Sequence, residues 1–499
     1  MQDLLPILPG QLNEIFGGIP YFMPEIYLSV LFLVVLVTDI LFGKSSGWLC
    51  RVIACTGLIV VIYKDLQQFQ LLLTGAHFLF NQMLLLTRTA LLFKLMIDVL
   101  AVLLLLNFEW DRKLSSHTKG LSDLYSISIA AIFGLHLMTM ASNLLMIYLS
   151  VEMVSVASYL MVAYRTENKW SSEAGLKYVL FGAASSAIML YGISLLYGLG
   201  GTLNLYVGNL LPGLLAANPV SVSLALILFF TGIGFKLSFV PVHFWVPDIY
   251  EGAPSPVSAF LSTVVKIAAF SLVISFLTAF MFFAKWTAFN FRLFLSVIGI
   301  ITMIAGNFAA VMQSNVKRML AYSSIGHTGF AMMALVTFTP EGLSALSFYL
   351  LAYSLANLGA WMLASYFADT AGAEDMNGYR GLGYRYPLAG VCFVVILISL
   401  TGLPVTAGFY AKFYTFSVAY QVYAHNHDVW LLLLMITGAV TTIVSLFYYI
   451  RIPLNLFLRK TDRTTGFASS NRFLLVSVAI ISILLVCLGL FPDIITRYL

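Results

Sequence analysis

Long apolar segments recur along the whole chain, and each is about as long as a membrane requires. A helix needs about 20 mostly apolar residues to cross the hydrocarbon core of a bilayer. Measured against that length, fourteen ranges are predicted to be spans: 23–43, 48–66, 86–107, 121–140, 142–164, 171–199, 219–239, 255–283, 288–312, 316–337, 341–368, 386–421, 428–453 and 471–492. The pattern predicts an all-α polytopic membrane protein with about 14 transmembrane helices, surrounded by the lipid bilayer.

One of these ranges is too long for a single crossing. Range 386–421 contains Gly402, Pro404 and Gly408 within its apolar sequence. Glycine and proline interrupt helices, because glycine lacks a Cβ atom and proline lacks the backbone N–H. We therefore expect one broken helix here. Two separate helices are the alternative, and they would shift the topology of every span that follows.

Composition agrees with a membrane protein. Hydrophobic residues make up 61% of the chain and charged residues only 9%, whereas a soluble domain carries roughly 25% charged residues. This excludes a soluble enzyme. The net charge is only +5 and no long Lys/Arg run is present, so we expect no nucleic-acid partner. The N-terminal sequence has no basic region and three prolines by Pro20, so we expect no cleavable signal peptide.

No motif for a cofactor or a metal ion stands out. The four cysteines form no C-x-x-C pair and lack the spacing of zinc or iron–sulfur ligands: Cys50, Cys55, Cys392 and Cys487. We expect them to be small buried side chains. The sequence also has no G-x-G-x-x-G after a strand and no Walker A loop. We therefore expect no redox chemistry, cofactor or metal in this chain, which leaves proton or cation translocation.

The basic residues predict the orientation of the chain. If the N-terminus lies outside, seventeen of the 26 Lys and Arg residues fall in cytoplasmic loops and five at outside ends. Cytoplasmic loops of membrane proteins carry an excess of Lys and Arg, so this orientation is favoured and both termini are expected outside. The remaining four are Lys94, Lys236, Lys266 and Lys412, which lie within predicted spans.

A faint internal repeat surrounds two of these lysines. Thr231-Gly232 leads through Gly234-Phe235 to Lys236, and Thr401-Gly402 leads through Gly408-Phe409 to Lys412. Both runs lie in a proline-interrupted apolar span, and the two spans enter the membrane from opposite faces. Interrupted spans at matching places in two halves are typical of inverted-repeat transporters. Chance similarity over so short a run is the alternative.

Charged residues inside a membrane cost about 2.5–3.5 kcal/mol each on insertion scales, so they point to function. Glu152 shares a helical face with Ser155 and Tyr159, and it either takes part in proton transfer or locks two helices together through a lysine. Lys236 follows two glycines and precedes Pro241, which predicts a broken helix around a hydrated cavity. A lysine in such a place can exchange protons, whereas an arginine cannot.

The other buried candidates have two interpretations each. Lys266 lies deep in range 255–283 and Lys412 follows the second break, and either could instead extend to a membrane face. His327, among small and hydroxyl residues, is a possible proton relay or a hydrogen-bonded packing residue. Lys94 and Asp98, spaced i, i+4, predict an internal ion pair with a structural role.

Five further positions carry ionisable side chains of interest. Asp39 and His136 lie in predicted spans and are candidates without a clear partner. His243, Asp248 and Glu251 lie in the short loop after the seventh span. They either line a cytoplasmic entry for protons or cap that loop.

Four segments carry a resemblance to a known family: 175–194, 235–254, 318–327 and 402–412. Around these motifs nearly the whole chain resembles the antiporter-like subunits of respiratory complex I and of multisubunit cation/proton antiporters, and among them the subunit N (chain 2) family. The resemblance implies fourteen helices with two inverted five-helix repeats, helices 4–8 and 9–13, in which helices 7 and 12 are broken. The expected units are 1–120, 121–283, 288–453 and 454–499.

The resemblance also implies roles for the buried charges. Glu152 matches the helix 5 glutamate that pairs with the helix 7 lysine, here Lys236. Lys266 matches the helix 8 lysine that connects two half-channels, and Lys412 matches the helix 12 residue near the outward exit. A lysine at that last position, where M-type subunits usually carry glutamate, favours the N-type. So does a chain that ends after fourteen helices, without the long lateral helix of L-type subunits.

The implied function is proton translocation as a membrane subunit of an NADH–quinone oxidoreductase. Flavin, iron–sulfur clusters and quinone are then expected in partner subunits, with K-, J- and M-type subunits as neighbours. The expected location is the cell inner membrane, with both termini on the periplasmic side. A subunit of a sodium/proton antiporter without a redox partner is the alternative, and a subunit that binds quinone itself is a third possibility.

Overall fold

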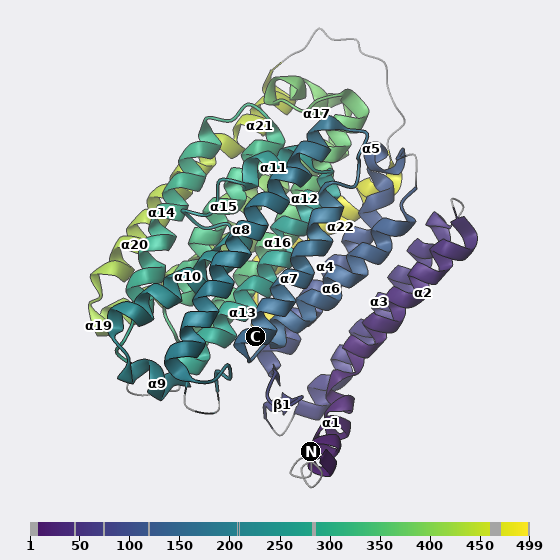
Figure 1. The fold of residues 1–499 in the computed structure, drawn as a ribbon. Helices are drawn as coiled ribbons and strands as arrows, with labels where there is room; N and C mark the ends of the chain where they lie inside the picture. The colour runs from purple at the N-terminus through teal and green to yellow at the C-terminus, as the bar shows by residue number, and fades with distance from the viewer. Residues whose placement is uncertain are drawn as a thin grey trace.

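The computed structural model describes most of the chain as a bundle of long helices (Figure 1). The described residues are 8–43, 46–72, 75–117, 120–206, 208, 210–281, 286–459 and 471–497. Four of the basic residues that we assigned to cytoplasmic loops lie outside these ranges: Lys44, Lys119, Lys460 and Arg463.

The N-terminal part consists of α1 (Leu8–Gly18), the 3-10 helix η1 (Ile19–Phe22), α2 (Met23–Phe42), α3 (Gly47–Leu71), α4 (Arg88–Trp110) and the short α5 (Arg112–Ser115). An antiparallel hairpin of β1 (His77–Leu79) and β2 (Leu84–Leu86) joins α3 to α4. Helices α2 and α3 form a pair at one edge of the bundle and pack against α6 and α4 (Figure 1).

The central part contains the helices that hold most of the candidate residues. They are α6 (Ser122–Met140), α7 (Leu144–Val162), α8 (Lys169–Gly200), α9 (Leu210–Ala216), α10 (Pro219–Leu237), α11 (Val246–Gly252), α12 (Ser255–Ser262), α13 (Val264–Met281), α14 (Phe291–Val311), α15 (Val316–Leu335) and α16 (Pro340–Ala371).

The C-terminal part completes the bundle. It consists of the 3-10 helix η4 (Met376–Tyr379), α17 (Leu382–Arg385), α18 (Pro387–Thr401), α19 (Ala407–Asn426), α20 (Val429–Tyr449), α21 (Arg451–Pro453), the short π-helix η5 (Leu454–Leu458), α22 (Arg472–Leu490) and α23 (Asp493–Thr496).

Many of the long helices begin at a side chain that caps the first turn. An Asn, Asp or Thr oxygen accepts a hydrogen bond from a backbone N–H that has no partner within the helix. The capping residues of the long helices are Thr87, Asn143, Asn168, Asn218, Asn290, Asn315, Thr339, Asp428 and Asn471. The polar loops therefore meet the apolar helices at these capping residues, as expected from the alternation of polar and apolar segments along the sequence.

Within the described residues, 11 helical segments are long and apolar enough to cross a membrane. Three of the predicted ranges lie on helices that are not among those 11: 48–66 on α3, 316–337 on α15 and 386–421 on the pair α18–α19. The polytopic all-α membrane fold is confirmed. The count of fourteen, the inverted repeats and the four-unit division stay predictions.

The interruptions of the helices agree only in part with the expected ones. The break in range 386–421 is confirmed, because α18 ends at Thr401 and α19 starts at Ala407. Helix α10 passes through Gly232 and Gly234 without a break and ends at Leu237. A further break at Thr263 separates α12 from α13 and was not predicted from the sequence.

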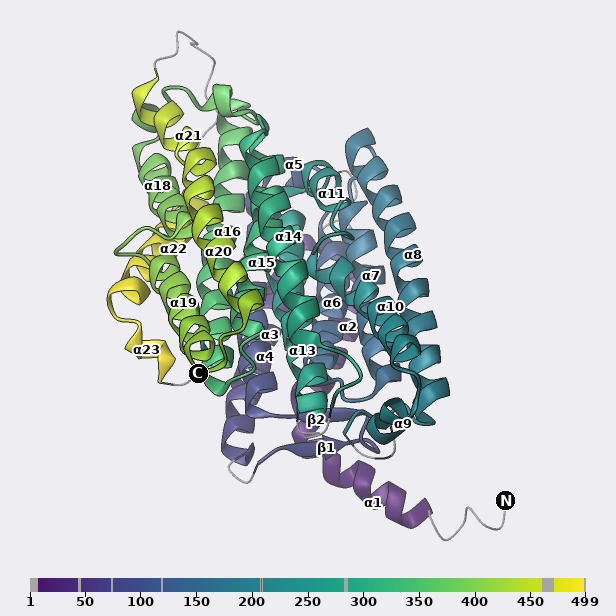
Figure 2. The same ribbon diagram turned by 90° about the vertical axis from the view of Figure 1, so that its left-hand side faces the viewer.

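The two ends of the bundle differ. The α11 end carries α5, α11 and α21, and the α9 end carries α1, α9 and the β1–β2 hairpin (Figures 1 and 2). Most of the loops that we assigned to the cytoplasm because of their basic residues lie at the α11 end. In the interior, α13, α15 and α16 are buried on nearly all sides, whereas α2, α3 and α22 expose large apolar side chains.

Candidate functional site

Each of the three central lysines lies next to an interruption in a helix. Lys236 is the second-to-last residue of α10, Lys266 follows the break at Thr263 by three residues, and Lys412 on α19 faces the end of α18. They are 3%, 1% and 8% exposed, respectively. Because the last carbonyls of a helix lack partners and attract cations, the helix ends at Lys236 and Lys412 favour a positive charge.

Aromatic rings lie between Lys236 and the face of α7 that carries Glu152. Lys236 Nζ lies 5.9 Å from the ring centroid of Tyr178, and Tyr178 meets Tyr159 edge to face at 4.9 Å. Among the described residues, neither Lys236 Nζ nor Glu152 Oε1 has a hydrogen-bond partner. The direct ion pair that the resemblance implies is therefore not formed in this arrangement, although Glu152 acts on Lys236 electrostatically.

Lys266, in contrast, is fully held by hydrogen bonds. Its Nζ donates to the carbonyl oxygen of Ser324 at 2.7 Å, to Ser324 Oγ at 2.6 Å and to Thr328 Oγ1 at 2.8 Å. All three donor positions of an ammonium group are thereby used. All of these partners are hydroxyl and carbonyl groups of α15, and among the described residues no carboxylate bonds to Lys266. Because α15 is buried inside the bundle, the interpretation of Lys266 as a lysine that extends to a membrane face is wrong.

A hydroxyl group joins the surroundings of Lys266 to those of Lys236. Thr328 Oγ1 accepts from Lys266 and donates to the carbonyl oxygen of Leu237 at 2.9 Å. Leu237 is the residue directly after Lys236 and the last residue of α10. The end of α10 and the start of α13 are therefore linked through one side chain of α15.

A second set of hydroxyl groups leads from Lys266 to His327. Ser324 Oγ accepts from the hydroxyl group of Tyr353 at 2.9 Å, and the ring of Tyr353 lies 4.8 Å from that of His327. His327 Nδ1 lies 2.7 Å from the Tyr349 hydroxyl oxygen, and Nε2 lies 3.3 Å from that of Tyr449. His327 is buried and hydrogen-bonded on both sides, an arrangement that suits a packing residue and a proton relay alike.

Two small cavities lie between His327 and Lys412. Each has a volume of about 10 Å³, and both are lined by His327, Tyr349 and Lys412. A polar cavity of roughly 10–15 Å³ is just large enough for one water molecule. In the cavity that Asn307 and Thr441 also line, a water molecule can therefore connect the imidazole with the ammonium group.

Lys412 is held by the backbone of the second break. Its Nζ donates to the carbonyl oxygen of Thr401 at 2.8 Å and lies 5.3 Å from the ring centroid of Phe330. The next residue, Gly402, has a φ of +83°, and a Cβ atom there would lie 2.6 Å from Lys412 Cδ. A glycine is thus required both by the backbone conformation and by the close approach of the lysine.

The tyrosines of α16 were not among the residues predicted from the sequence. Tyr349, Tyr353 and Asn357 lie four residues apart and form one polar face of an otherwise apolar helix. That spacing was visible in the sequence. The hydroxyl groups of Ser324 and Thr328 on α15, also four residues apart, carried the same signal.

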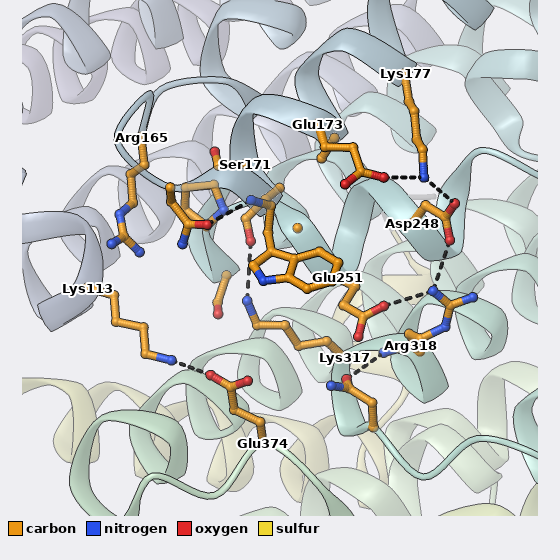
Figure 3. A pocket seen from close by; sticks show the side chains of 18 of the residues that line it. Lys113, Arg165, Ser171, Glu173, Lys177, Asp248, Glu251, Lys317, Arg318 and Glu374 are labelled. Carbon is orange, nitrogen blue, oxygen red and sulfur yellow. Dashed lines mark hydrogen bonds and ion pairs between the residues drawn. The ribbon is translucent and has the colours of Figure 1, made fainter.

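A charged pocket of about 340 Å³ lies near the α11 end (Figure 3). Arg318 Nη1 lies 2.9 Å from Asp248 Oδ1 and 2.8 Å from Glu251 Oε2. Lys177 reaches Glu173 at 2.9 Å and Asp248 at 3.0 Å, which extends the network to α8. The pocket is therefore lined by alternating acids and bases, of which the carboxylates and the lysines can bind or release protons while Arg318 supplies a fixed positive charge.

The three candidates that follow α10 lie in different places in the structure. Asp248 and Glu251 line the charged pocket, whereas His243 is not among its lining residues and bonds to the carbonyl oxygen of Pro241 at 3.3 Å. Partial burial opposes the charge of Asp248, but hydrogen bonds from Lys177 and Arg318 outweigh it and lower the pKa of Asp248 below its usual 3.8. Burial lowers the pKa of His243.

A second buried group of charges joins the N-terminal helices, and here one prediction was wrong. Lys94 Nζ lies 2.7 Å from Glu25 Oε1 and 2.8 Å from Asp65 Oδ1, whereas Asp98 Oδ1 meets His136 Nε2 at 2.9 Å. The predicted pair of Lys94 with Asp98 is thus replaced by partners from other helices. Glu25 and Asp65 were not recognised as candidates in the sequence. Asp39 lies apart and accepts from Ser46 at 3.0 Å.

Comparisons with known proteins agree on one family. Residues 141–444 match the family model described as NADH:quinone oxidoreductase/Mrp antiporter, TM. A curated relative, NADH-quinone oxidoreductase subunit N 2 of Chloroherpeton thalassium, is 36% identical over 462 residues, which cover 91% of this chain and 89% of the relative.

Solved structures show the same fold. A chain of respiratory complex I from Thermus thermophilus matches with a TM-score of 0.77 and 28% identity, over 95% of this chain and 98% of that one. A chain of the Mrp complex from Dietzia sp. DQ12-45-1b also matches with a TM-score of 0.77, over 95% of each chain. Its identity is 18%, so that likeness concerns the fold alone.

Proposed function

Because this chain belongs to the NADH:quinone oxidoreductase/Mrp antiporter transmembrane family, we propose that it is the N-type proton-translocating membrane subunit of an NADH–quinone oxidoreductase. The matched range 141–444 contains every candidate of the central line, from Glu152 to Lys412. The relative at 36% identity, which is named as subunit N, supports the N-type over the other members of the family.

The observation that carries the proposal is a line of ionisable groups through the middle of the bundle. Lys236 and Lys266 are joined through Thr328, and His327 and Lys412 share two water-sized cavities. A membrane interior tolerates such groups only where they are paired or hydrated, and they usually mark the path of an ion. Lysine and histidine both change charge by losing a proton, which suits proton transfer.

The proposed path has an entry, a central section and an exit. Protons enter from the charged pocket and reach Glu152 and Lys236. From Lys236 the path continues to Lys266, whose ammonium group is stabilised by Ser324 and Thr328. Rotation of those hydroxyl groups releases the proton toward His327, and water in the cavity that Asn307 and Thr441 line carries it to Lys412. Lys412 then delivers it toward the α9 end, after its bond to the carbonyl of Thr401 opens.

In this proposal the chain itself carries no redox centre. Flavin, iron–sulfur clusters and quinone belong to partner subunits, and their electron transfer supplies the energy. K-, J- and M-type membrane subunits are the neighbours. The complex lies in the cell inner membrane with the basic α11 end toward the cytoplasm. The N-terminal helix α1 and the C-terminal α23 would then both lie at the periplasmic end, which fits their common place at the α9 end (Figure 2).

Co-purification tests the assembly. An affinity tag on this chain should retrieve a membrane complex that contains flavin and iron–sulfur proteins and oxidises NADH. A complex that lacks both groups would contradict the proposal. That result would instead favour the sodium/proton antiporter, the alternative that shares every buried charge.

Substitution of Lys236 tests the path. Lys236→Ala should leave NADH oxidation by the assembled complex measurable but sharply reduce proton uptake into proteoliposomes. Lys169→Ala is the matched control, because Lys169 is exposed at the start of α8. If Lys236→Ala pumps like the control, Lys236 does not belong to the path.

A further inference from the structure

Five fully buried ionisable side chains form a closed ring on four helices, apart from the central line. They are Glu25 of α2, Asp65 of α3, Lys94 and Asp98 of α4, and His136 of α6, and each is 0% exposed. The charges of such a group must balance one another, because an ionised side chain away from water is stable only when its charge is balanced and hydrogen-bonded.

The ring has four links between opposite charges. Lys94 Nζ lies 2.8 Å from Asp65 Oδ1 and 2.7 Å from Glu25 Oε1. Glu25 Oε1 lies 3.1 Å from His136 Nδ1, and His136 Nε2 lies 2.9 Å from Asp98 Oδ1. An ionised carboxylate only accepts hydrogen bonds, so both nitrogens of His136 must carry hydrogen, and the imidazole is positively charged.

The fifth link closes the ring and differs from the others, because it joins two acids. The carboxyl groups of Asp65 and Asp98 lie within hydrogen-bonding reach of each other. Asp65 Oδ2 and Asp98 Oδ2 are buried, and no donor among the described residues faces them. Two facing carboxyl groups have no donor between them unless one carries a proton, and neighbouring carboxylates accordingly share one.

The charge count leads to the same conclusion. Three carboxylates against Lys94 and a charged His136 would leave one unbalanced negative charge in the membrane. One additional proton makes the ring neutral. Asp65 and Asp98 are the best carriers, because each has a cation near only one oxygen, Lys94 at 2.8 Å from Asp65 Oδ1 and His136 at 2.9 Å from Asp98 Oδ1, and an Oδ2 atom that no donor among the described residues faces. Glu25 Oε1, in contrast, lies close to both cations, Lys94 and His136.

We propose that this ring is a proton-binding site, in which one exchangeable proton is held between Asp65 and Asp98. Binding is a simple protonation, in which a carboxylate takes a proton from water and becomes a carboxylic acid. The ring thereby attaches the edge helices α2 and α3 to α4 and α6 in a state that depends on that proton. The proposal is independent of the proton path from Glu152 to Lys412.

A metal ion is a poorer occupant of the same place. Glu25, Asp65 and His136 offer ligand atoms within 4.8 Å of one another. However, the ammonium group of Lys94 already lies against two of these three residues and supplies the positive charge that a cation would bring. The other charged groups of these four helices whose partners are given lie elsewhere: Arg51 pairs with Glu109, Asp39 bonds to Ser46 and Lys64 bonds to Gln67.

Amide substitutions in the tagged, assembled membrane complex test the proposal. Asp65→Asn replaces a neutral acid by a neutral amide, so the amount of assembled complex should stay near the wild-type level. Glu25→Gln removes a charged member and should lower that amount several-fold, since abundance in cells follows stability. Adding Lys94→Met to Glu25→Gln restores neutrality and should recover part of the loss.

Infrared spectroscopy of the same preparations reports the proton directly. Wild-type complex should show a protonated carboxyl C=O band that shifts in D2O, and Asp65→Asn should lose it. Glu14→Gln is the control, because Glu14 is exposed on α1 and its substitution should leave the band unchanged. Wild-type complex should also become more protease-sensitive near α2 and α3 at alkaline pH, and Asp65→Asn should not.

Three results would overturn the proposal. In the first, Asp65→Asn lowers the amount of assembled complex as much as Glu25→Gln does, which would make Asp65 a required anion. In another, Asp65→Asn assembles but keeps the full carboxyl band. The third is a stoichiometric sodium or divalent ion in the wild-type complex that Asp65→Asn lacks, because a cation would then balance the ring.

Discussion

Removal of the hydroxyl group of Thr328 tests the junction between Lys236 and Lys266. Valine has nearly the shape of threonine, so Thr328→Val removes the group that accepts from Lys266 at 2.8 Å and donates to the carbonyl of Leu237 at 2.9 Å. The two other bonds of Lys266, both to Ser324, stay in place. The substitution therefore destabilises the charged form of Lys266 but leaves its two bonds to Ser324 and the packing around it in place.

The magnitude follows from the bonds that are lost. A hydrogen bond to a charged group contributes about 1.5–3 kcal/mol, and each 1.36 kcal/mol is a factor of ten in an equilibrium or a rate. If the proton must rest on Lys266 during transit, that state becomes harder to populate, and we expect proton transfer to slow by roughly 10- to 150-fold. The orphaned carbonyl of Leu237 adds about 1–3 kcal/mol of destabilisation to the fold.

The assay is the number of protons taken up by proteoliposomes per NADH oxidised by purified complex. Thr415→Val is the matched control, because Thr415 is also buried but, within the part of the chain that the structure describes, its side chain bonds only to the carbonyl of Ala411 in its own helix. The control should keep the wild-type ratio while Thr328→Val loses most of it. Equal ratios in the two variants would refute the role of Thr328, provided that both chains are present in the complex.

Three further substitutions probe other parts of the site. Gly402→Ala places a Cβ 2.6 Å from Lys412 Cδ and should reduce proton uptake, whereas Gly201→Ala, at φ +71° with open space around it, should cost only stability in thermal unfolding. His327→Leu should abolish uptake if the imidazole relays protons, and near-normal uptake would assign His327 to packing. Because the pKa of Asp248 lies below 3.8, its bonds are present at neutral pH and are lost only as pH falls through that lowered value. Asp248→Asn should therefore weaken the complex in chemical denaturation at pH 7, and the difference from wild type should shrink as pH falls through that value; a difference that does not change with pH would contradict this.

The sequence predicted the apolar architecture well because a bilayer imposes the length of each span. It predicted the break before Lys412 for a similarly local reason, since glycine and proline mark it. The break at Thr263 has no such mark, because Phe260-Leu261-Ser262-Thr263 contains neither residue. Packing against α16, where Tyr353 and Asn357 bond to Ser262, accompanies that break and is invisible in a single helix.

The wrong partner for Lys94 has a related cause. Spacing of i, i+4 brings Asp98 onto the same face, but it says nothing about carboxylates on other helices. A buried ammonium group takes the partners that surround it in three dimensions, here Glu25 and Asp65. Glu25 lies two residues after the start of its predicted span and was not singled out in the sequence. Only the fold brings it to the centre of a charged group.

The acceptor of Lys412 has a consequence for mutational surveys of this protein. That acceptor is the backbone carbonyl of Thr401, an atom which every amino acid provides. A scan that replaces side chains one at a time leaves it intact and will assign position 401 no importance for the lysine. Deletions or insertions within 402–406, which move the end of α18 relative to α19, will reveal it instead.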